Sequence, residues 1–377
     1  MATDAPPTAW NAIPLADRMG WARRHMRRTA AAGAALPPMP DVRLAATVHV
    51  DLKSALMMVA CVEAGAQVKV HPADAATTRA DVVAHLAGLG IPIADVATCV
   101  AWRPTHTLEM GGDIAVAAGP GSGIRAGIEV TRTGLTRLAA ARIDHPVFDL
   151  DGVPLKHDLH NRFAGVPLKH DLHNRFAVGT STWHAFTART NLSLHGQVVG
   201  VIGFGEVGAG LAHAARTLGA RVVVAEPDPA RATMAAFGGF EVAALPETAA
   251  RADVLVTATG RDNVVSAAVI GALKDGCILL NAGHSAAEIA VAALGAGTPV
   301  LPHVTQHRVE GRAVFLFAGG HIANLAAGDG DSLNAFDVTA ALMTAAIGWT
   351  VEHGTDHPPG IHPLPDAAWR PAITLDG

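Results

Sequence analysis

The segment from Val198 to Asp228 sets three glycines between two strongly apolar runs, and this arrangement restricts the fold more than any other feature of the chain. The pattern G-x-G-x-x-G is formed by Gly203, Gly205 and Gly208, directly after a strand-like run and at the start of a helical one. The first glycine permits a tight turn, the second lets a ligand approach the backbone, and the third lets the helix pack on the strand. We therefore expect a strand–turn–helix unit of a parallel α/β sheet.

A second apolar run ends at an acid, Glu226. The start of the helix, which includes Glu206 and Val207, offers backbone N–H groups and a positive dipole end to a pyrophosphate. A carboxylate at the position of Glu226 binds ribose hydroxyls and repels a 2′-phosphate. The sequence thus predicts a dinucleotide site for NAD rather than NADP, and the one nearby signal for NADP is Arg231.

Short apolar runs alternate with helical patterns along the whole chain, which is typical of parallel sheets covered by helices. In the first half, strand-like runs include residues 44–50, 67–70, 114–118 and 146–150. We expect an α/β fold with two doubly wound domains joined by a hinge. A substrate domain would take residues 1–178, with 332–377 returning to it, and a Rossmann NAD-binding domain would take residues 179–331.

Composition excludes several classes of protein. Of the 377 residues, 50% are hydrophobic and 16% are charged, so the chain can form large cores and is not a disordered protein. A net charge of −5 gives no reason to expect a nucleic-acid partner. The N-terminus lacks the apolar core of a signal peptide, and no uncharged stretch near the C-terminus is long enough to cross a membrane. We therefore expect a cytoplasmic protein without a membrane partner.

A 13-residue string, GVPLKHDLHNRFA, occurs twice in direct succession, at residues 152–164 and 165–177. Identity without any divergence indicates a recent in-frame duplication, and a solenoid needs at least three units. The run that begins at His145 continues into the first copy, whereas the second copy continues toward the hinge. One copy is therefore surplus, and we expect the first to form a loop.

An ordered series of segments resembles the S-adenosylhomocysteine hydrolase (adenosylhomocysteinase) family over nearly the whole chain. No segment is decisive alone, but their order is specific. They are IPLADRMGWARRHM, VHVDLKSALMMVACVEAGAQV, GGD at 111–113, GIR at 123–125, EVTRTG at 129–134, GFGEVGAG, NAGH at 281–284 and ANL at 323–325.

The resemblance implies a reaction in which tightly bound NAD+ oxidises the 3′-hydroxyl of an adenosyl thioether to a ketone. The ketone acidifies the C4′ proton, a base removes it, and the 5′ thiol leaves. Water then adds at C5′, and the stored hydride reduces the ketone again. The resemblance also implies closure of the substrate domain over the NAD-binding domain and a homo-oligomer, either a dimer or a tetramer.

Particular residues take roles by the same resemblance. Lys169 corresponds to the base at the 3′-hydroxyl; Lys156 is its copy, and we favour Lys169 because the Asn174 beside it lies close to the hinge. His49 corresponds to a histidine near C4′ and C5′, and His284 to one near the 3′-hydroxyl. The other expected cofactor contacts are Thr131, Thr133, Asn174, Thr259, Asn281 and Asn324.

Departures from the family concern the substrate. His173 replaces the aspartate that follows the catalytic lysine, and it can itself act as a base near neutral pH. Val130 and Met110 replace two carboxylates, and Asp51 and Lys53 replace a threonine and a glutamate on the adenine side.

The remaining acids that we expect near the substrate are Glu109, Glu129 and Asp113. The family's C-terminal lysine and tyrosine are absent, since the chain has no tyrosine and no lysine after Lys274. We expect redox chemistry at a nucleoside 3′-position to be retained, with hydrolysis of adenosylhomocysteine weak or redirected to another nucleoside.

Three other interpretations were weighed. HDLH and HVTQH have ligand-like spacings, but no companion Cys or Glu pattern accompanies them, so we expect solvent-facing histidines and no metal. A 2-hydroxyacid dehydrogenase would need an arginine and a Glu–His pair beside the cofactor. A non-catalytic NAD-dependent regulator is favoured by the missing carboxylates and opposed by the retained Lys169, His49 and His284.

Overall fold

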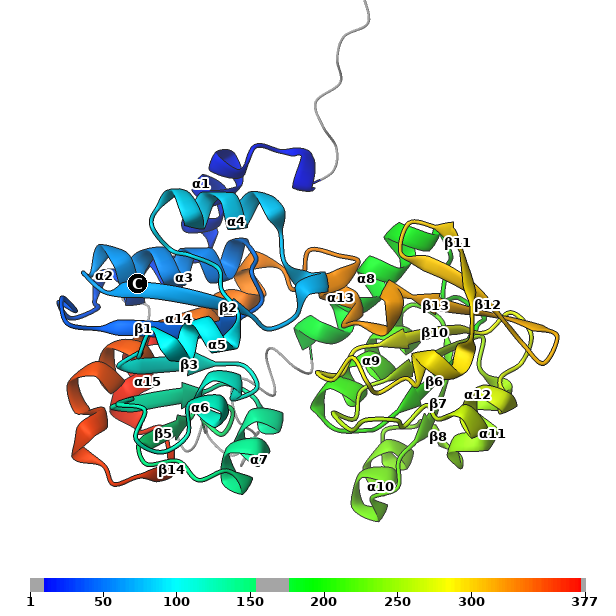
Figure 1. Ribbon diagram of the computed structural model, residues 1–377. Coiled ribbons are helices and arrows are strands. Elements are labelled where there is room, and N and C mark those ends of the chain that lie inside the picture. The colour runs from blue at the N-terminus through cyan, green and yellow to red at the C-terminus, as the bar shows by residue number, and fades with distance from the viewer. Residues whose placement is uncertain (1–9, 154–175, 374–377) are drawn as a thin grey trace, which may run out of the picture. The chain divides into compact units, whose positions relative to one another are not determined.

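The computed structural model describes residues 10–153 and 176–373. The chain divides into two compact units, residues 1–169 with 333–377 and residues 170–332 (Figure 1). Each unit contains a mainly parallel sheet covered by helices, which confirms the expected α/β class. Most of the duplicated segment, with Lys156, Lys169, His173 and Asn174, lies outside the described residues, as does the loop expected for the first copy.

The first unit is built on a six-stranded sheet with the order β14-β5-β4-β3-β1-β2, and all its strand pairs are parallel. One face is covered by helices from both ends of the chain, and the other face by α5, α6 and α7. The strands are β1 (Arg43–Val48), β2 (Gln67–Pro72), β3 (His106–Glu109), β4 (Ala126–Glu129), β5 (Pro146–Asp149) and β14 (Gly360–Pro363). The helices are α1 (Leu15–His25), α2 (Arg27–Ala34), α3 (Leu52–Glu63), α4 (Ala80–Gly88), α5 (Val96–Ala101), α6 (Asp113–Ala118), α7 (Arg132–Ala140), α14 (Leu333–His353) and α15 (Asp366–Ile373).

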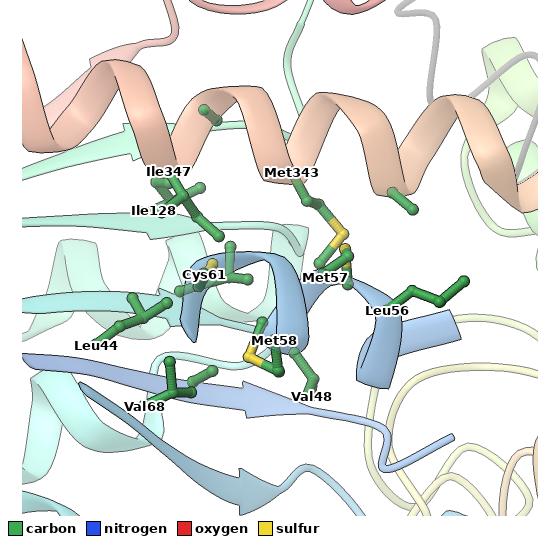
Figure 2. Close-up of a cluster of buried hydrophobic side chains, with 14 of the residues drawn as sticks. Leu44, Val48, Leu56, Met57, Met58, Cys61, Val68, Ile128, Met343 and Ile347 are labelled. Atoms are coloured by element: carbon green, nitrogen blue, oxygen red, sulfur yellow. The ribbon is translucent and has the colours of Figure 1, made fainter. Parts of the chain in front are cut away.

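The core of the first unit lies between this sheet, α3 and α14. Helix α3 is apolar on nearly every side, and a helix of that pattern is buried in a core. Figure 2 shows the side chains of α3 between those of α14 and those of the strands. The labelled residues of this cluster are Leu44, Val48, Leu56, Met57, Met58, Cys61, Val68, Ile128, Met343 and Ile347.

The second unit has an eight-stranded sheet with the order β11-β12-β13-β10-β9-β6-β7-β8. From β8 to β13 this is the 3-2-1-4-5-6 order of a Rossmann fold, and β12 and β11 extend it through two antiparallel pairings, β13 with β12 and β12 with β11. The strands are β6 (Val198–Ile202), β7 (Arg221–Ala225), β8 (Glu241–Val242), β9 (Val254–Thr257), β10 (Ile278–Asn281), β11 (Gly297–Leu301), β12 (Val304–Val309) and β13 (Arg312–Phe317). The helices are α8 (Val178–Thr190), α9 (Glu206–Thr217), α10 (Pro229–Phe237), α11 (Leu245–Arg251), α12 (Ala267–Ala272) and α13 (Ala323–Ala326).

One predicted strand is wrong, because residues 114–118 belong to helix α6. The backbone of Gly111 and Gly112 has positive φ values of 119° and 69°, which turns the chain out of β3 into the helix. The Glu109 carboxylate then accepts hydrogen bonds from the N–H groups of Ile114 and Ala115. A five-residue apolar run does not distinguish a strand from a buried helix. Here the glycine turn and the hydrogen bonds to Glu109 favour the helix.

Within the described residues, no helix has both the length and the apolar character needed to cross a membrane.

Candidate functional site

The glycine turn after β6 has the geometry of a phosphate cradle. Gly203 has a φ of +91°, and a Cβ at this position would lie 2.9 Å from the Ala258 carbonyl oxygen. A Cβ at Gly208 would lie 2.0 Å from the Gly203 carbonyl oxygen, so helix α9 packs against the turn as closely as a glycine allows. Gly205 is the N-cap of α9, and the nearest atom to a Cβ built there is Nη1 of Arg231 at 4.0 Å. The space above Gly205 is therefore open to a ligand.

Glu226 lies just beyond β7 and fastens this turn. Its Oε2 accepts a hydrogen bond of 2.6 Å from the Phe204 N–H, and its Oε1 accepts one of 2.9 Å from the Asp228 N–H. The carboxylate thus connects the glycine turn with the loop after the second strand, beside the place that a ribose would take.

Asn324 carries a buried acceptor that no described residue of the chain satisfies. Its Oδ1 has no hydrogen-bond partner among the described residues, although the side chain is only 4% exposed. Its Nδ2 donates to Ser181 Oγ at 3.0 Å and to Asp331 Oδ1 at 3.3 Å, which orients the amide. A buried acceptor of this kind calls for a donor from a ligand, and the carboxamide of nicotinamide carries one. Together with the open cradle, Asn324 fits a bound dinucleotide.

Glu288, which the sequence analysis missed, joins two loops at the carboxyl end of the second sheet. Its fully buried carboxylate accepts hydrogen bonds from Thr257 Oγ1, from Thr259 Oγ1 at 2.8 Å and from the N–H groups of Thr259 and Gly260 at 2.9 and 2.8 Å. A Cβ at Gly283 would lie 1.7 Å from Glu288 Oε1, so the glycine of NAGH makes room for this acid. The sequence signal that could have found Glu288 is that it is an isolated acid in the small-residue stretch NAGHSAAEI.

Asn281 shapes the loop that carries His284. Its Nδ2 donates to the carbonyl oxygens of Ser285 and Gly320 at 2.8 and 2.9 Å, and its Oδ1 accepts from the Gly283 N–H at 2.8 Å. The whole amide is thus engaged within the protein. His284 itself is partly exposed.

In the first unit, three predicted residues lie where β1 leads into α3. His49 Nδ1 is 2.8 Å from Thr77 Oγ1. Asp51 caps α3 by accepting from the N–H groups of Lys53 and Ser54 at 3.0 and 2.9 Å, and the Lys53 ammonium lies 2.9 Å from its Oδ2. Burial alone would raise the pKa of the Asp51 carboxyl, but the Lys53 charge and the hydrogen bonds outweigh it and lower that pKa below its ordinary value.

Glu109 and Glu129 face each other in register at the ends of β3 and β4, and both are buried. The Glu109 carboxylate caps α6, with hydrogen bonds of 2.6 and 3.0 Å from the Ile114 and Ala115 N–H groups. Burial, reinforced by the charge of Glu129, raises the pKa of Glu109 to about 8. Glu129 Oε1 accepts from the N–H and the hydroxyl of Thr131, both at 2.7 Å, and from the Gly111 N–H at 3.1 Å.

The remaining predicted residues of the first unit are partly occupied by local contacts. The Thr131 hydroxyl also caps α7 by accepting from the Gly134 N–H at 3.0 Å, while Thr133 lies partly exposed in the first turn of that helix. Asp113 forms an ion pair of 2.6 Å with Arg137.

In the second unit, His307 of the HVTQH motif is buried, with Nδ1 3.1 Å from the Gly295 carbonyl oxygen. The expectation of a solvent-facing histidine is therefore wrong there.

Fold and site together define a class: an α/β protein in which a Rossmann domain binds NAD. Residues 174–330 match the family model described as "S-adenosyl-L-homocysteine hydrolase, NAD binding domain". The adenosylhomocysteinase of Thermotoga maritima is 30% identical over 93% of this chain and 90% of its own length. That of Aeropyrum pernix is 32% identical over 87% and 82%, and the S-inosyl-L-homocysteine hydrolase of Methanopyrus kandleri is 29% identical over 93% and 86%. The chain belongs to the S-adenosylhomocysteine hydrolase family.

Proposed function

We propose that this chain is an NAD-dependent hydrolase that oxidises the 3′-hydroxyl of a nucleosyl thioether and thereby enables reversible cleavage of the 5′ thioether bond. The observation that carries the proposal is the joining of an NAD-binding domain of this family to a first unit whose sheet edge holds His49, Glu109 and Glu129. NAD+, when bound, would supply the hydride acceptor that oxidation of the sugar needs.

The protein's own groups would move the protons. We assign Lys169 to the proton of the 3′-hydroxyl and His49 to the proton at C4′, with His173 as a second base beside the lysine. The contact between His49 and Thr77 orients the imidazole, and imidazole exchanges protons near neutral pH. We assign His284 to the ribose, on the loop that Asn281 holds in place.

The substrate's base is where this chain departs from adenosylhomocysteinases. On the adenine side, a residue that only accepts hydrogen bonds, glutamate, is replaced by Lys53, which only donates. The Lys53 ammonium is paired with Asp51, and its remaining N–H groups would favour an acceptor on the base, such as a carbonyl, over an amino group. One relative is named for an inosyl substrate, whose base carries such a carbonyl. We therefore propose a 6-oxopurine nucleosyl thioether as the preferred substrate, with the adenosyl thioether as the alternative.

The test is to incubate the purified NAD-loaded protein with S-adenosylhomocysteine and with S-inosylhomocysteine, while trapping free thiol and following the absorbance of reduced NAD. We expect reduced NAD with both ligands and faster thiol release from the inosyl compound. The double variant Asp51→Thr/Lys53→Glu replaces both members of the ion pair by the family's residues and should shift the preference toward the adenosyl compound, whereas Arg142→Gln, an exposed change in the same unit, should leave it unchanged.

Two results would contradict the proposal in different ways. Reduced NAD without thiol from either compound would mean nucleoside 3′-oxidation without hydrolysis. An unchanged NAD spectrum with both compounds and with both free nucleosides would mean a non-catalytic NAD-binding regulator.

A further inference from the structure

A cavity of about 370 Å³ opens at the edge of the first sheet opposite to His49, Glu109 and Glu129. The adjacent strands β4, β3, β1 and β2 are parallel, so their first residues lie together at this amino edge. The lining residues stand at or just before the starts of these strands, or in the segment that leads into β1. They are Pro40, Asp41, Arg43, Gln67, Thr105 and Arg125.

Two guanidinium groups line this cavity, and neither has an ion-pair partner among the residues that the structure describes. Arg43 Nε is buried and has no hydrogen-bond partner among the described residues. Neither Arg43 nor Arg125 forms an ion pair within the described part of the chain. Asp41 is the one carboxylate of the lining, so the two arginines leave an excess of one positive charge.

The neighbouring histidine adds no charge to the cavity. Burial is the main cause, and the charge of Arg125 the second, that lowers the pKa of His106 to about 4. This imidazole is therefore neutral at pH 7. The positive field at this edge therefore comes from the arginines.

The backbone holds both arginines in place. Thr105 Oγ1 accepts from the Arg43 N–H at 2.9 Å, the Thr105 N–H donates to the Arg43 carbonyl oxygen at 2.9 Å, and the Arg125 N–H donates to the Thr105 carbonyl oxygen at 2.8 Å. Thr105 thus connects the starts of three strands. These bonds fix the backbone from which both side chains extend, and a guanidinium fork suits an oxyanion that accepts several hydrogen bonds.

We propose that this cavity is a second ligand site, which binds a phosphate group through Arg43 and Arg125. The volume exceeds that of one phosphate, so the group can be free or carried by a small sugar. The exposed amide of Gln67 offers a further donor at the same edge. The site is distinct from the cradle above Gly205, which belongs to the other unit.

The experiment is a calorimetric titration of the protein loaded with saturating NAD, so that the pyrophosphate cradle is filled. Inorganic phosphate and ribose 5-phosphate are titrated separately in a chloride buffer near neutral pH. We expect saturable binding at one site, weakened by about tenfold or more in Arg43→Gln and in Arg125→Gln. Arg142→Gln, a matched exposed arginine of the same unit, should bind like the wild type. Tighter binding of the sugar phosphate would identify a phosphate ester as the ligand, and equal affinities would identify free phosphate.

Arg43→Lys separates charge from geometry, since lysine keeps the charge and loses the fork; its affinity should lie between those of the wild type and Arg43→Gln. Thermal unfolding and NAD content establish that each variant is folded, and Arg125 is exposed enough for its replacement to be tolerated. The proposal fails if the wild type shows no saturable binding, or if the double variant Arg43→Gln/Arg125→Gln binds as tightly as the wild type. Because binding is read without turnover, this result does not depend on the proposed catalytic function.

Discussion

At the scale of single residues, the first unit keeps two acids where solvent does not reach. Glu109 and Glu129 are 1% and 0% exposed, and each accepts backbone hydrogen bonds that hold a loop at the edge of the sheet. Burial disfavours the ionised form of Glu109 and is the main reason that its pKa rises, and the neighbouring charge of Glu129 adds to the effect. The two acids therefore hold the loops in position, and ionisation of Glu109 lowers the free energy of unfolding as pH rises.

The pH dependence of stability tests this assignment. Between the ordinary glutamate value of 4.5 and about 8, the folded protein binds the Glu109 proton more tightly than the unfolded chain does. Stability should therefore fall as pH rises through this window, by up to about 1.4 kcal/mol per pH unit. Glu109→Gln cannot ionise, so its thermal midpoint relative to the wild type should increase from about pH 5 to about pH 8. The exposed change Glu247→Gln should follow the wild type, and parallel curves for Glu109→Gln would contradict the assignment.

The pair of Lys53 and Asp51 gives a second prediction at this scale. Lys53→Met leaves the Asp51 carboxylate buried without its cation, and we expect a loss of about 3 kcal/mol in unfolding free energy. Adding Asp51→Ser should recover part of the loss, because serine keeps the N-cap and carries no charge. Lys274→Met breaks a half-exposed pair with Asp253 and should cost at most about 1 kcal/mol. Urea unfolding measures all three, and equal losses in the two single variants would refute the buried-pair argument.

At the scale of elements, the loops at the carboxyl ends of strands are built by acids that lie elsewhere in the sequence. Glu226 holds the turn after β6, and Glu288 holds the loop after β9 against the loop after β10. The Rossmann order brings β6 and β9 side by side, and the crevice for a dinucleotide lies at this change of strand order. We therefore expect the shape of these loops to affect NAD binding.

Two glycine variants separate folding from cofactor binding in the turn. Gly205→Ala adds a methyl group to open space at a φ of −72°, so the thermal midpoint should hardly change while NAD binds about tenfold more weakly or worse. Gly208→Ala forces a Cβ against the Gly203 carbonyl oxygen, and we expect it to cost about 3 kcal/mol or more. Fluorescence titration with NAD and thermal unfolding read the two effects. Normal NAD affinity in Gly205→Ala would mean that the pyrophosphate does not lie over this turn.

Local patterns of apolar and polar residues predicted most of the strands and helices. The strands predicted over 44–50, 67–70 and 146–150 are β1, β2 and β5, with ends that differ by at most two residues. Helix α6 and the strands β3 and β4 did not follow from the sequence, because each is a run of four to six residues whose form depends on its neighbours.

At the scale of the whole molecule, the C-terminal segment of the chain packs into the same unit as the N-terminal segment. Helix α14 packs between α2, α3 and the sheet of the first unit, and β14 pairs with β5. The last part of the sequence thus completes the first core, while residues 170–332 form their own unit. Two passages of the chain connect the units, and the duplication lies in the first of them.

Deletion of one copy tests whether the duplication matters to the molecule. Because the copies are identical, removing residues 152–164 or 165–177 yields the same protein. It keeps one copy of the string, with its lysine, its HDLH and its asparagine. We expect the shortened protein to keep its NAD and its thermal midpoint, since loop length changes the closure entropy only slowly, by less than about 1 kcal/mol here. Replacing the remaining lysine by methionine in this background should abolish NAD reduction by a nucleoside. Loss of folded protein or of NAD on deletion would show that both copies are needed.

The sequence by itself determined the features that a few adjacent residues encode: the glycine turn, the NAD cofactor, the α/β class and the family. It also located His49, Asp51 and Lys53 around one helix start, because their spacing is local. Only the tertiary structure decided which acids hold which loops, that Asn324 keeps a buried acceptor open, and that Arg43 and Arg125 share a cavity. Those relations join residues far apart in the chain, and they arise from strand order and burial, which no local pattern specifies.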